Sequence, residues 1–173
     1  MPPKSRIERE RILNQAFVLA RKDGFESLTV RGLAASLGCS TQPIYDAFAD
    51  RGALEAAVAR RAFAFMLQAL RENPEPDVPP DAATALGYIR FALEEGHLFR
   101  LIAQNGLFAA SPDSREVKAE EHTPDAVALP DLRLVIFANG ILFMALHGTL
   151  PADWPSIRAL VFSARDAFCK AQA

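Results

Sequence analysis

Four side chains that are able to donate or accept hydrogen bonds lie close together in the first third of this chain of 173 residues. Thr41, Gln42, Tyr45 and Asp46 are three or four positions apart in pairs, so a short helix would place them on its outward side. Hydroxyl and amide groups bind phosphates and base edges, and a glutamine amide can bind adenine through two hydrogen bonds. Side chains of these types are therefore chemically able to contact a nucleic acid.

The other residues that could carry chemistry do not form a pattern typical of a catalytic or metal site. His97, His122 and His147 are about 25 residues apart, and none has a second histidine three or four positions away. There is no Ser/His/Asp order or phosphate-binding glycine loop, and Cys39 and Cys169 fit no zinc or redox spacing. We expect a protein that is not an enzyme, binds no metal and no cofactor, and keeps both cysteines reduced.

The elements that would position the polar side chains are two helices and a tight turn at residues 28–48. Thr29 is a typical N-cap, apolar residues recur at positions 30, 33, 34 and 37, and Gly38 can adopt the left-handed conformation that ends a helix. Ser40 would cap the second helix, with Pro43 in its first turn. This is the spacing of a helix-turn-helix, whose second helix enters the DNA major groove. An ordinary α-hairpin of an all-helical protein is the alternative.

A longer pattern surrounds this motif. Its pieces are Asp23-Gly24-Phe25, Thr29-Val30-Arg31, Leu33-Ala34, Leu37-Gly38, Ser40, Ile44-Tyr45, Phe48, Arg51 and Ala53-Leu54. In this order they resemble the N-terminal DNA-binding domain of the TetR family of transcriptional regulators, over residues 12–58. The resemblance implies an all-α fold, with a three-helix DNA-binding domain at residues 5–52 and a helical ligand-binding and dimerisation domain at residues 53–173.

The resemblance also implies roles for individual residues. Tyr45 would place its hydroxyl on a phosphate, and Thr41 and Gln42 would face base edges. The remaining candidate DNA contacts are Thr29, Arg31, Ser40, Asp46 and Arg51, where Arg51 would neutralise a phosphate at the start of the fourth helix. Arg6 or Arg9, at the start of the first helix, are further candidates for phosphate contact.

Three positions depart from the family pattern. Thr41 stands where a Lys or Arg is common, Asp46 and Ala47 stand where a His, Tyr or Asn pair often contacts DNA, and Gly32 replaces the usual acidic partner of Thr29. Because an acid beside phosphates repels them, we expect DNA binding that is weaker and more salt-sensitive than in the family, or an Asp46 that reads cytosine N4.

Composition and charge agree with a soluble all-helical protein. Half of the residues are apolar, and they recur at helical spacing. Residues 1–51 hold eight Lys and Arg against six Asp and Glu, whereas the remainder holds eleven against fifteen. A formal net charge of −2 argues against indiscriminate coating of nucleic acid. No secretory signal opens the sequence and no apolar run is long enough to span a bilayer, so we expect a cytoplasmic protein without membrane partners.

The C-terminal part is expected to form a homodimer. Residues 131–150 are apolar on nearly every side of a helix, which requires burial on all sides. The last two helices of TetR-family proteins pack into a four-helix dimer interface, and the resemblance places residues 131–150 and 155–172 there; a central core helix is the alternative. The candidate interface residues are Leu134, Phe137, Ile141, Ala145, Leu160, Ala164 and Phe168.

Large soft side chains in this part predict an apolar ligand pocket. With twelve Phe against two Tyr and one Trp, few polar groups could orient a ligand. The candidate lining residues are Phe63, Met66, Phe91, Phe99, Ile102, Phe108, Phe143 and His147.

These observations predict a TetR-like regulator, a repressor that an apolar small molecule releases from a palindromic double-stranded operator. The alternative is a helical dimer that serves as a ligand-binding or protein-interaction module and no longer binds DNA strongly.

Overall fold

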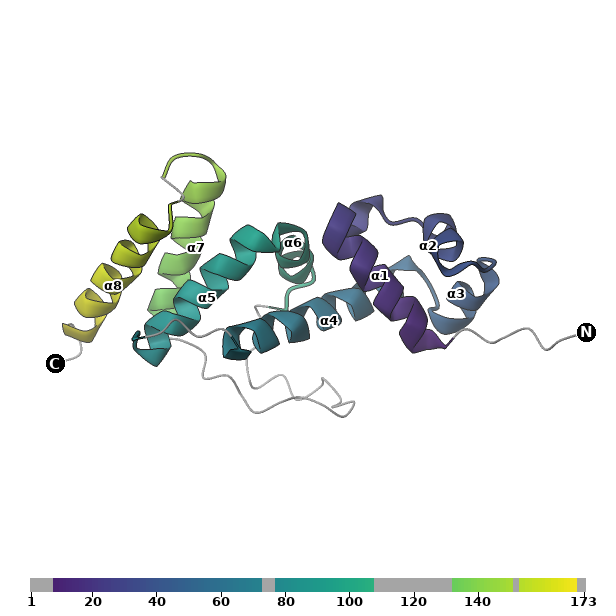
Figure 1. Cartoon of the computed structure of the whole chain (residues 1–173), viewed down its shortest axis with the longest axis horizontal. Helices are drawn as coiled ribbons and strands as arrows, with labels where there is room; N and C mark the ends of the chain where they lie inside the picture. The colour runs from purple at the N-terminus through teal and green to yellow at the C-terminus, as the bar shows by residue number, and fades with distance from the viewer. Residues whose placement is uncertain (1–7, 73–76, 108–131, 151–152, 171–173) are drawn as a thin grey trace, which may run out of the picture. The chain divides into compact units, whose positions relative to one another are not determined.

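The computed structural model describes residues 8–72, 77–107, 132–150 and 153–170, and all regular structure in these ranges is helical (Figure 1). The elements are α1 (Arg9–Asp23), a 3₁₀ turn η1 (Phe25–Ser27), α2 (Val30–Leu37), α3 (Gln42–Ala47), α4 (Arg51–Glu72), α5 (Pro80–Glu94), α6 (Gly96–Gln104), α7 (Leu132–Leu146) and α8 (Trp154–Lys170). The predicted all-α fold is confirmed. No helix in the described ranges is long and apolar enough to cross a membrane.

The chain forms two compact units. The head unit comprises Met1–Phe65 and Glu95–Ser114, and the body unit comprises Met66–Glu94 and Arg115–Ala173. The division falls inside α4, which has 22 residues and would be about 33 Å long. The head unit also includes α6, whereas the domain boundary expected at residues 52 and 53 placed α6 with the C-terminal domain. That boundary describes an expected division of function and stays a prediction.

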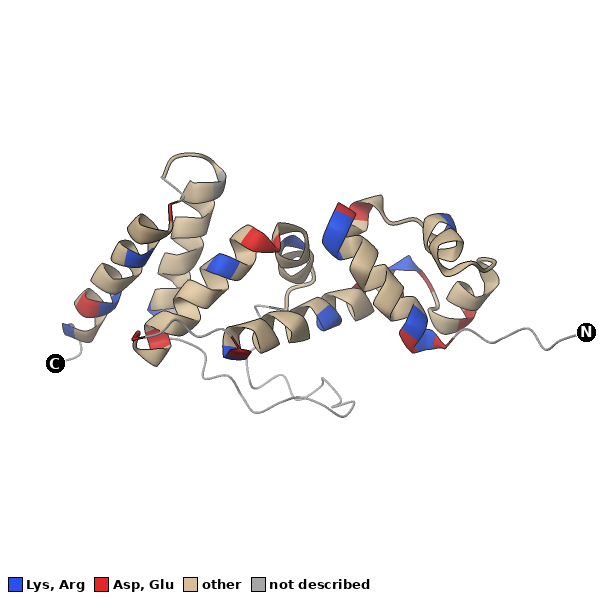
Figure 2. Ribbon diagram, viewed as in Figure 1, with Lys and Arg blue, Asp and Glu red and all other residues tan. Residues whose placement is uncertain are grey.

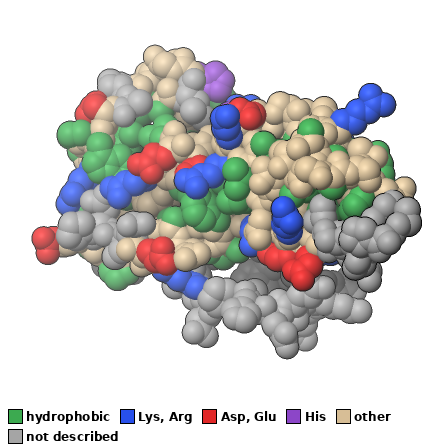
Figure 3. Space-filling view, turned by 45° about the vertical axis from the view of Figure 1, so that its right-hand side comes forward, with side chains coloured by type: hydrophobic (Ala, Val, Ile, Leu, Met, Phe, Trp, Pro, Cys, Tyr) green, Lys and Arg blue, Asp and Glu red, His purple; other side chains and the backbone are tan. Residues whose placement is uncertain are grey.

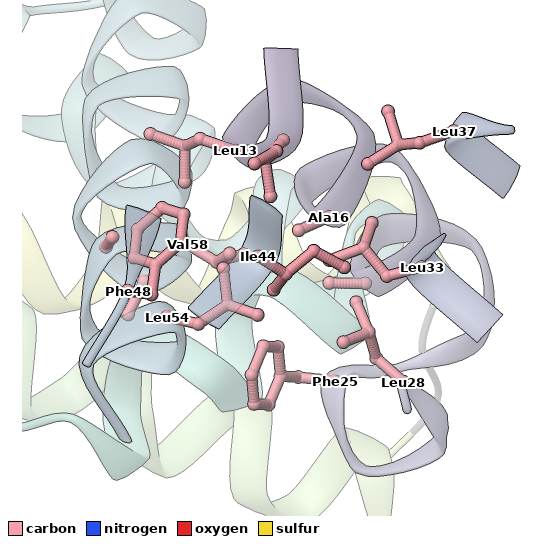
Figure 4. Close-up of a cluster of buried hydrophobic side chains, with 14 of the residues drawn as sticks. Leu13, Ala16, Phe25, Leu28, Leu33, Leu37, Ile44, Phe48, Leu54 and Val58 are labelled. Atoms are coloured by element: carbon pink, nitrogen blue, oxygen red, sulfur yellow. The ribbon is translucent and has the colours of Figure 1, made fainter. Parts of the chain in front are cut away.

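The core of the head unit is formed by the apolar stripes of α1, α2, α3 and the first part of α4 (Figure 4). Leu33 of α2 and Val58 of α4 are fully buried, and Ile44 of α3 is almost so. The first helix begins at Arg9, after Glu8 at the N-cap position, and ends at Asp23, with Gly24 at the C-cap position.

Helix α6 packs against α1 within the head unit. Leu101 belongs to the core of the head unit. The Arg21 Nε atom donates to both carboxylate oxygens of Glu95, at 3.0 and 2.9 Å. A Cβ atom on Gly24 would lie 3.1 Å from His97 Nδ1, so a larger residue at position 24 would displace that side chain. The segment around residues 95–101 is therefore part of the scaffold that supports α1.

The body unit is built from α5, α7 and α8, which pack against one another. The buried residues of α5 include Leu86 and Ile89, and α8 contributes Ile157 and Val161. At one edge of the bundle, Arg165 Nε donates to the Asp81 carboxylate at 3.0 and 2.9 Å. The three helices therefore share one apolar interior.

Candidate nucleic-acid interface

Helix α2 begins with the cap that the sequence predicts. The Thr29 Oγ1 atom accepts a hydrogen bond from the Gly32 backbone N–H at 3.0 Å. A Cβ atom at position 32 would lie only 3.0 Å from this oxygen, so glycine permits the close approach. Because a threonine hydroxyl is both donor and acceptor, the Thr29 hydroxyl proton remains able to bind a phosphate oxygen.

The turn after α2 forces the chain to change direction. Gly38 has φ +68° and ψ +33°, in the left-handed region that favours glycine. The Cys39 N–H donates to Ala34 O at 3.0 Å, and the Gly38 N–H donates to Ala35 O at 3.1 Å. These are the two hydrogen bonds of a Schellman motif, so the carbonyl groups of Ala34 and Ala35 are satisfied within the turn.

Helix α3 starts one residue later than expected. Thr41, and not Ser40, occupies the N-cap position, and its side chain makes no capping hydrogen bond. The Thr41 carbonyl accepts the N–H groups of Ile44 and Tyr45 at 3.1 and 3.3 Å. Pro43 has no N–H, so the first turn has one donor fewer to satisfy and α3 can begin without a side-chain cap. The expected capping role of Ser40 is therefore wrong, and Ser40 is simply exposed.

The two sides of α3 differ sharply. Ile44 is only 2% exposed and Phe48, which follows the helix, is also buried in the head core. Gln42 and Asp46 are exposed, and Tyr45 is 55% exposed although it is a large aromatic residue. A six-residue helix anchored by one isoleucine thus presents three polar side chains to solvent.

Two of these polar side chains bind each other. The Gln42 Nε2 atom donates to Asp46 Oδ1 at 2.9 Å, across one turn of α3. The sequence predicts Gln42 and Asp46 as separate base contacts. Their spacing of four residues contained the signal for this pair, because residues four apart are neighbours on a helix.

The Arg51 guanidinium bonds to the backbone of the head. Its Nη atoms donate to the carbonyl oxygens of Leu28, Phe25 at 3.0 Å and Glu26 at 3.4 Å, and its Cζ lies 5.0 Å from the centroid of the Phe25 ring. Arg51 therefore joins η1 to the start of α4. The sequence does not predict this structural role, because nothing in the local pattern around position 51 shows which distant carbonyl groups will face it.

Basic residues elsewhere in the head lie beside acidic ones. Figure 2 shows both signs of charge at the two ends of α1, where the described residues include Glu10 in the first turn and Arg21 in the last. Arg9 Cζ lies 4.7 Å from the centroid of the Phe48 ring, just after α3, and Arg31 on α2 is exposed. Arg31 therefore lies within the helix-turn-helix and Arg9 beside its last residue, and Arg6 lies outside the described residues.

The predicted ligand residues are divided between the two units. Phe63, Phe99 and Ile102 belong to the head unit, and Met66, Phe91, Phe143 and His147 to the body unit, while Phe108 lies outside the described residues. Met66, Phe91 and Ile102 are buried, whereas Phe143 is 64% exposed and stacks on His147 with ring centroids 4.2 Å apart. The pocket formed by these residues remains a prediction.

The predicted dimer residues are mostly packed within the protomer. Leu134, Ile141 and Ala164 are buried in the body unit, and the rings of Phe137 and Phe168 pack edge to face at 6.4 Å. Ala145 and Leu160 are half-buried. Because α7 is apolar on nearly every side, the sequence could not indicate which side faces the protomer's own core.

A different face of α7 is open, and we call it the α7 face: Ile136, Asn139, Gly140, Phe143, Met144 and His147, all exposed. These positions recur three or four apart and form one continuous stripe. Ile136 is 63% exposed and Met144 44%. Figure 3 shows that apolar side chains reach the protein surface, with basic side chains between them.

No group of three or more His, Cys, Asp or Glu side chains in the described ranges is placed to hold a metal ion. Within the body unit, the hydroxyl of Tyr88 donates to Asn139 Oδ1 at 2.9 Å. Burial raises the pKa of Tyr88 to about 12.

Comparisons with known proteins find solved structures of similar fold. No protein-family profile and no curated protein sequence matches the chain. A protein of unknown function from Rhodococcus sp. RHA1 has a similar structure, with a TM-score of 0.62, 24% identity and coverage of 99% of this chain and 98% of that one.

Two further solved structures are similar to this chain. The multidrug binding protein EbrR, complexed with imidazole, has a TM-score of 0.57 and 20% identity, over 90% of this chain and 88% of its own. A TetR-family transcriptional regulator from Haemophilus influenzae has a TM-score of 0.54 and 12% identity, over 90% of this chain and 93% of its own. The chain therefore has a TetR-like fold.

Proposed function

We propose that this protein of TetR-like fold is a DNA-binding transcriptional regulator. The observation that carries the proposal is the arrangement of α3: one side is held by Ile44 in the head core, and the other presents Gln42, Tyr45 and Asp46 to solvent after a Schellman turn. A helix of this kind, preceded by a second helix across a tight turn, fits the DNA major groove.

The proposed contacts follow from the chemistry of the exposed groups. The hydroxyl of Tyr45 would donate to a phosphate, and Thr29 and Arg31 would bind the same backbone from α2. Thr41 and Gln42 would face base edges. Phosphate contacts position the protein, and base contacts select the sequence.

The proposed assembly is a homodimer through α7 and α8. The α7 face exposes Ile136, Phe143 and Met144, and the exposed positions of α8 include the small residues Ala159 and Ser163, one turn apart. Small residues allow a close approach of helices, and a twofold axis makes such a surface complementary to its own copy. Two heads about 34 Å apart would then read successive major grooves of a near-palindromic operator.

The proposed effector is an apolar small molecule that releases the repressor from its operator. The buried side chains of the body unit are almost all aliphatic or aromatic. EbrR, a multidrug binding protein, has a similar fold. A ligand that favours the DNA-free dimer by about 1–3 kcal/mol would lower operator affinity roughly 5- to 150-fold.

One observation favours a second function. Asp46 places an exposed carboxylate on the outward side of α3, where it would repel phosphates. The second candidate is therefore a helical dimer that binds a ligand or another protein and no longer binds DNA strongly.

Gel shifts with the DNA that flanks the protein's own coding region separate the two functions. We expect a retarded complex at low salt that is competed by the same DNA more effectively than by random DNA. Absence of any complex with these fragments and with a randomised library at low salt would favour the second function.

A thermal-shift screen of hydrophobic small molecules tests the effector. The best hit is then titrated into the protein–operator complex. A hit that raises Tm but leaves operator affinity unchanged would contradict release by ligand, while the DNA-binding function would stand.

A further inference from the structure

The hydrogen bond between Gln42 and Asp46 restricts the orientation of the Gln42 amide. Both side chains are exposed on α3, and the bond from Nε2 to Oδ1 is 2.9 Å long. An ionised carboxylate only accepts hydrogen bonds, so the amide nitrogen of Gln42, and not its oxygen, must face Asp46. If the amide turned over, its oxygen would face the carboxylate and the two would repel each other.

The groups of Gln42 that remain available match one base. The amide nitrogen carries two hydrogen atoms, of which Asp46 takes one, so one N–H and the Oε1 atom remain. In the major groove, adenine presents the N7 acceptor and the N6 donor, which are the complements of these two groups. Guanine presents two acceptors, N7 and O6, and Oε1 would repel O6.

We propose that Asp46 is a positioning residue that holds Gln42 in the orientation that selects adenine over guanine. The proposal rests on the proposed function, because it concerns the same interface with DNA. It assigns the acid on α3 a role in specificity that acts through Gln42, although the same charge weakens affinity for all DNA. Each operator half-site then carries adenine at the base pair that faces Gln42.

A selection from a library with randomised half-sites tests this role. The proteins compared are the wild type, Gln42→Ala, Asp46→Ala and the double variant, and the measured quantity is the ratio of bound adenine to guanine at each position. We expect a roughly 5- to 150-fold preference for adenine at one position of the wild-type half-site. Asp46→Ala should lose most of this preference, Gln42→Ala should lose it, and the double variant should resemble Gln42→Ala, because Asp46 acts through Gln42.

Helix α4 offers a matched control. Gln68 Nε2 donates to Glu72 Oε1 at 2.7 Å, so the same kind of pair, with the same spacing, lies outside the recognition helix. Glu72→Ala should leave every base preference unchanged. Circular dichroism should show unchanged helix content in all variants, since all four side chains are exposed.

Three results would overturn the proposal, and they differ from one another. An adenine preference that survives Asp46→Ala would show that Asp46 does not position Gln42. A cytosine preference that is lost in Asp46→Ala but kept in Gln42→Ala would show that Asp46 reads a base itself. No selection of any DNA by the wild type at low salt would overturn the proposed function and this inference with it.

Discussion

The head unit and the body unit use apolar residues in different ways. In the head, α3 is short and has one apolar side, so Ile44 can only point inward and the polar residues must point outward. In the body, α7 is apolar almost throughout, and its buried residues Leu134 and Ile141 are no more apolar than the exposed Ile136. A mixed pattern determines orientation, whereas a uniform apolar pattern leaves it to the packing of neighbouring helices.

The largest effect is expected from the inward side of α3. Ile44→Ala removes a side chain that is 2% exposed and should lower the free energy of unfolding by about 2–5 kcal/mol. Gln42→Ala, on the outward side of the same helix, should change it by no more than about 0.5 kcal/mol. Urea denaturation of both variants measures the contrast, and equal losses would mean that α3 is not two-sided in solution.

Substitutions on the two sides of α7 should distinguish effects on dimer assembly from effects on the stability of the protomer. Phe143→Ser should weaken the dimer by about 2 kcal/mol or more, because a large exposed aromatic residue is a typical interface anchor. The protomer should keep its helix content. Ile141→Ala should instead destabilise the protomer itself, since Ile141 is buried in the body unit.

Sedimentation velocity at micromolar concentration distinguishes these outcomes. A wild-type protein that sediments as a monomer would contradict the dimer through the α7 face.

Substitution of Arg51 tests whether this residue of the head unit stabilises the fold, binds DNA or does both. Loss of its hydrogen bonds to the η1 carbonyl groups should lower the stability of the head, by up to about 1.5 kcal/mol because the side chain is exposed. If Arg51 also binds a phosphate, as the TetR resemblance implies, Arg51→Ala should reduce the salt dependence of DNA binding by about one unit.

Tyr45→Phe is the comparison for Arg51→Ala. It should weaken binding to all sequences about fivefold through the lost phosphate hydrogen bond and leave stability unchanged. An Arg51→Ala variant with an unaltered salt dependence would restrict Arg51 to its structural role.

The smallest effect is expected at Tyr88, whose hydroxyl donates a hydrogen bond to Asn139 within the body unit. The chain has two tyrosines, so tyrosinate absorbance in Tyr45→Phe reports Tyr88 alone, and its midpoint should lie near pH 12. The folded-state pKa lies above the ordinary value of 10, so the unfolded chain loses its proton first. The contribution of Tyr88 to stability should thus be complete below pH 10 and decline as the pH rises towards 12.

Tyr88→Phe should remove this part of the pH dependence. A midpoint at pH 10 in the folded protein would contradict the burial of Tyr88.

The sequence by itself determined the helix-turn-helix, because each signal is local. The Thr29 cap, the left-handed Gly38 and the inward position of Ile44 depend on neighbours within one or two helical turns. The same locality explains why the outward position of Tyr45 could be predicted.

Only the tertiary structure decided the features that join distant residues or choose among equivalent ones. Arg51 meets carbonyl groups more than twenty residues earlier, and α6 joins the head unit although it follows α5 of the body unit. The N-cap position of α3 at Thr41 in place of Ser40 depends on the turn that precedes it. The open face of α7 could not be read from a helix with apolar residues on every side, because the side that becomes buried is chosen by the contacts of α5 and α8.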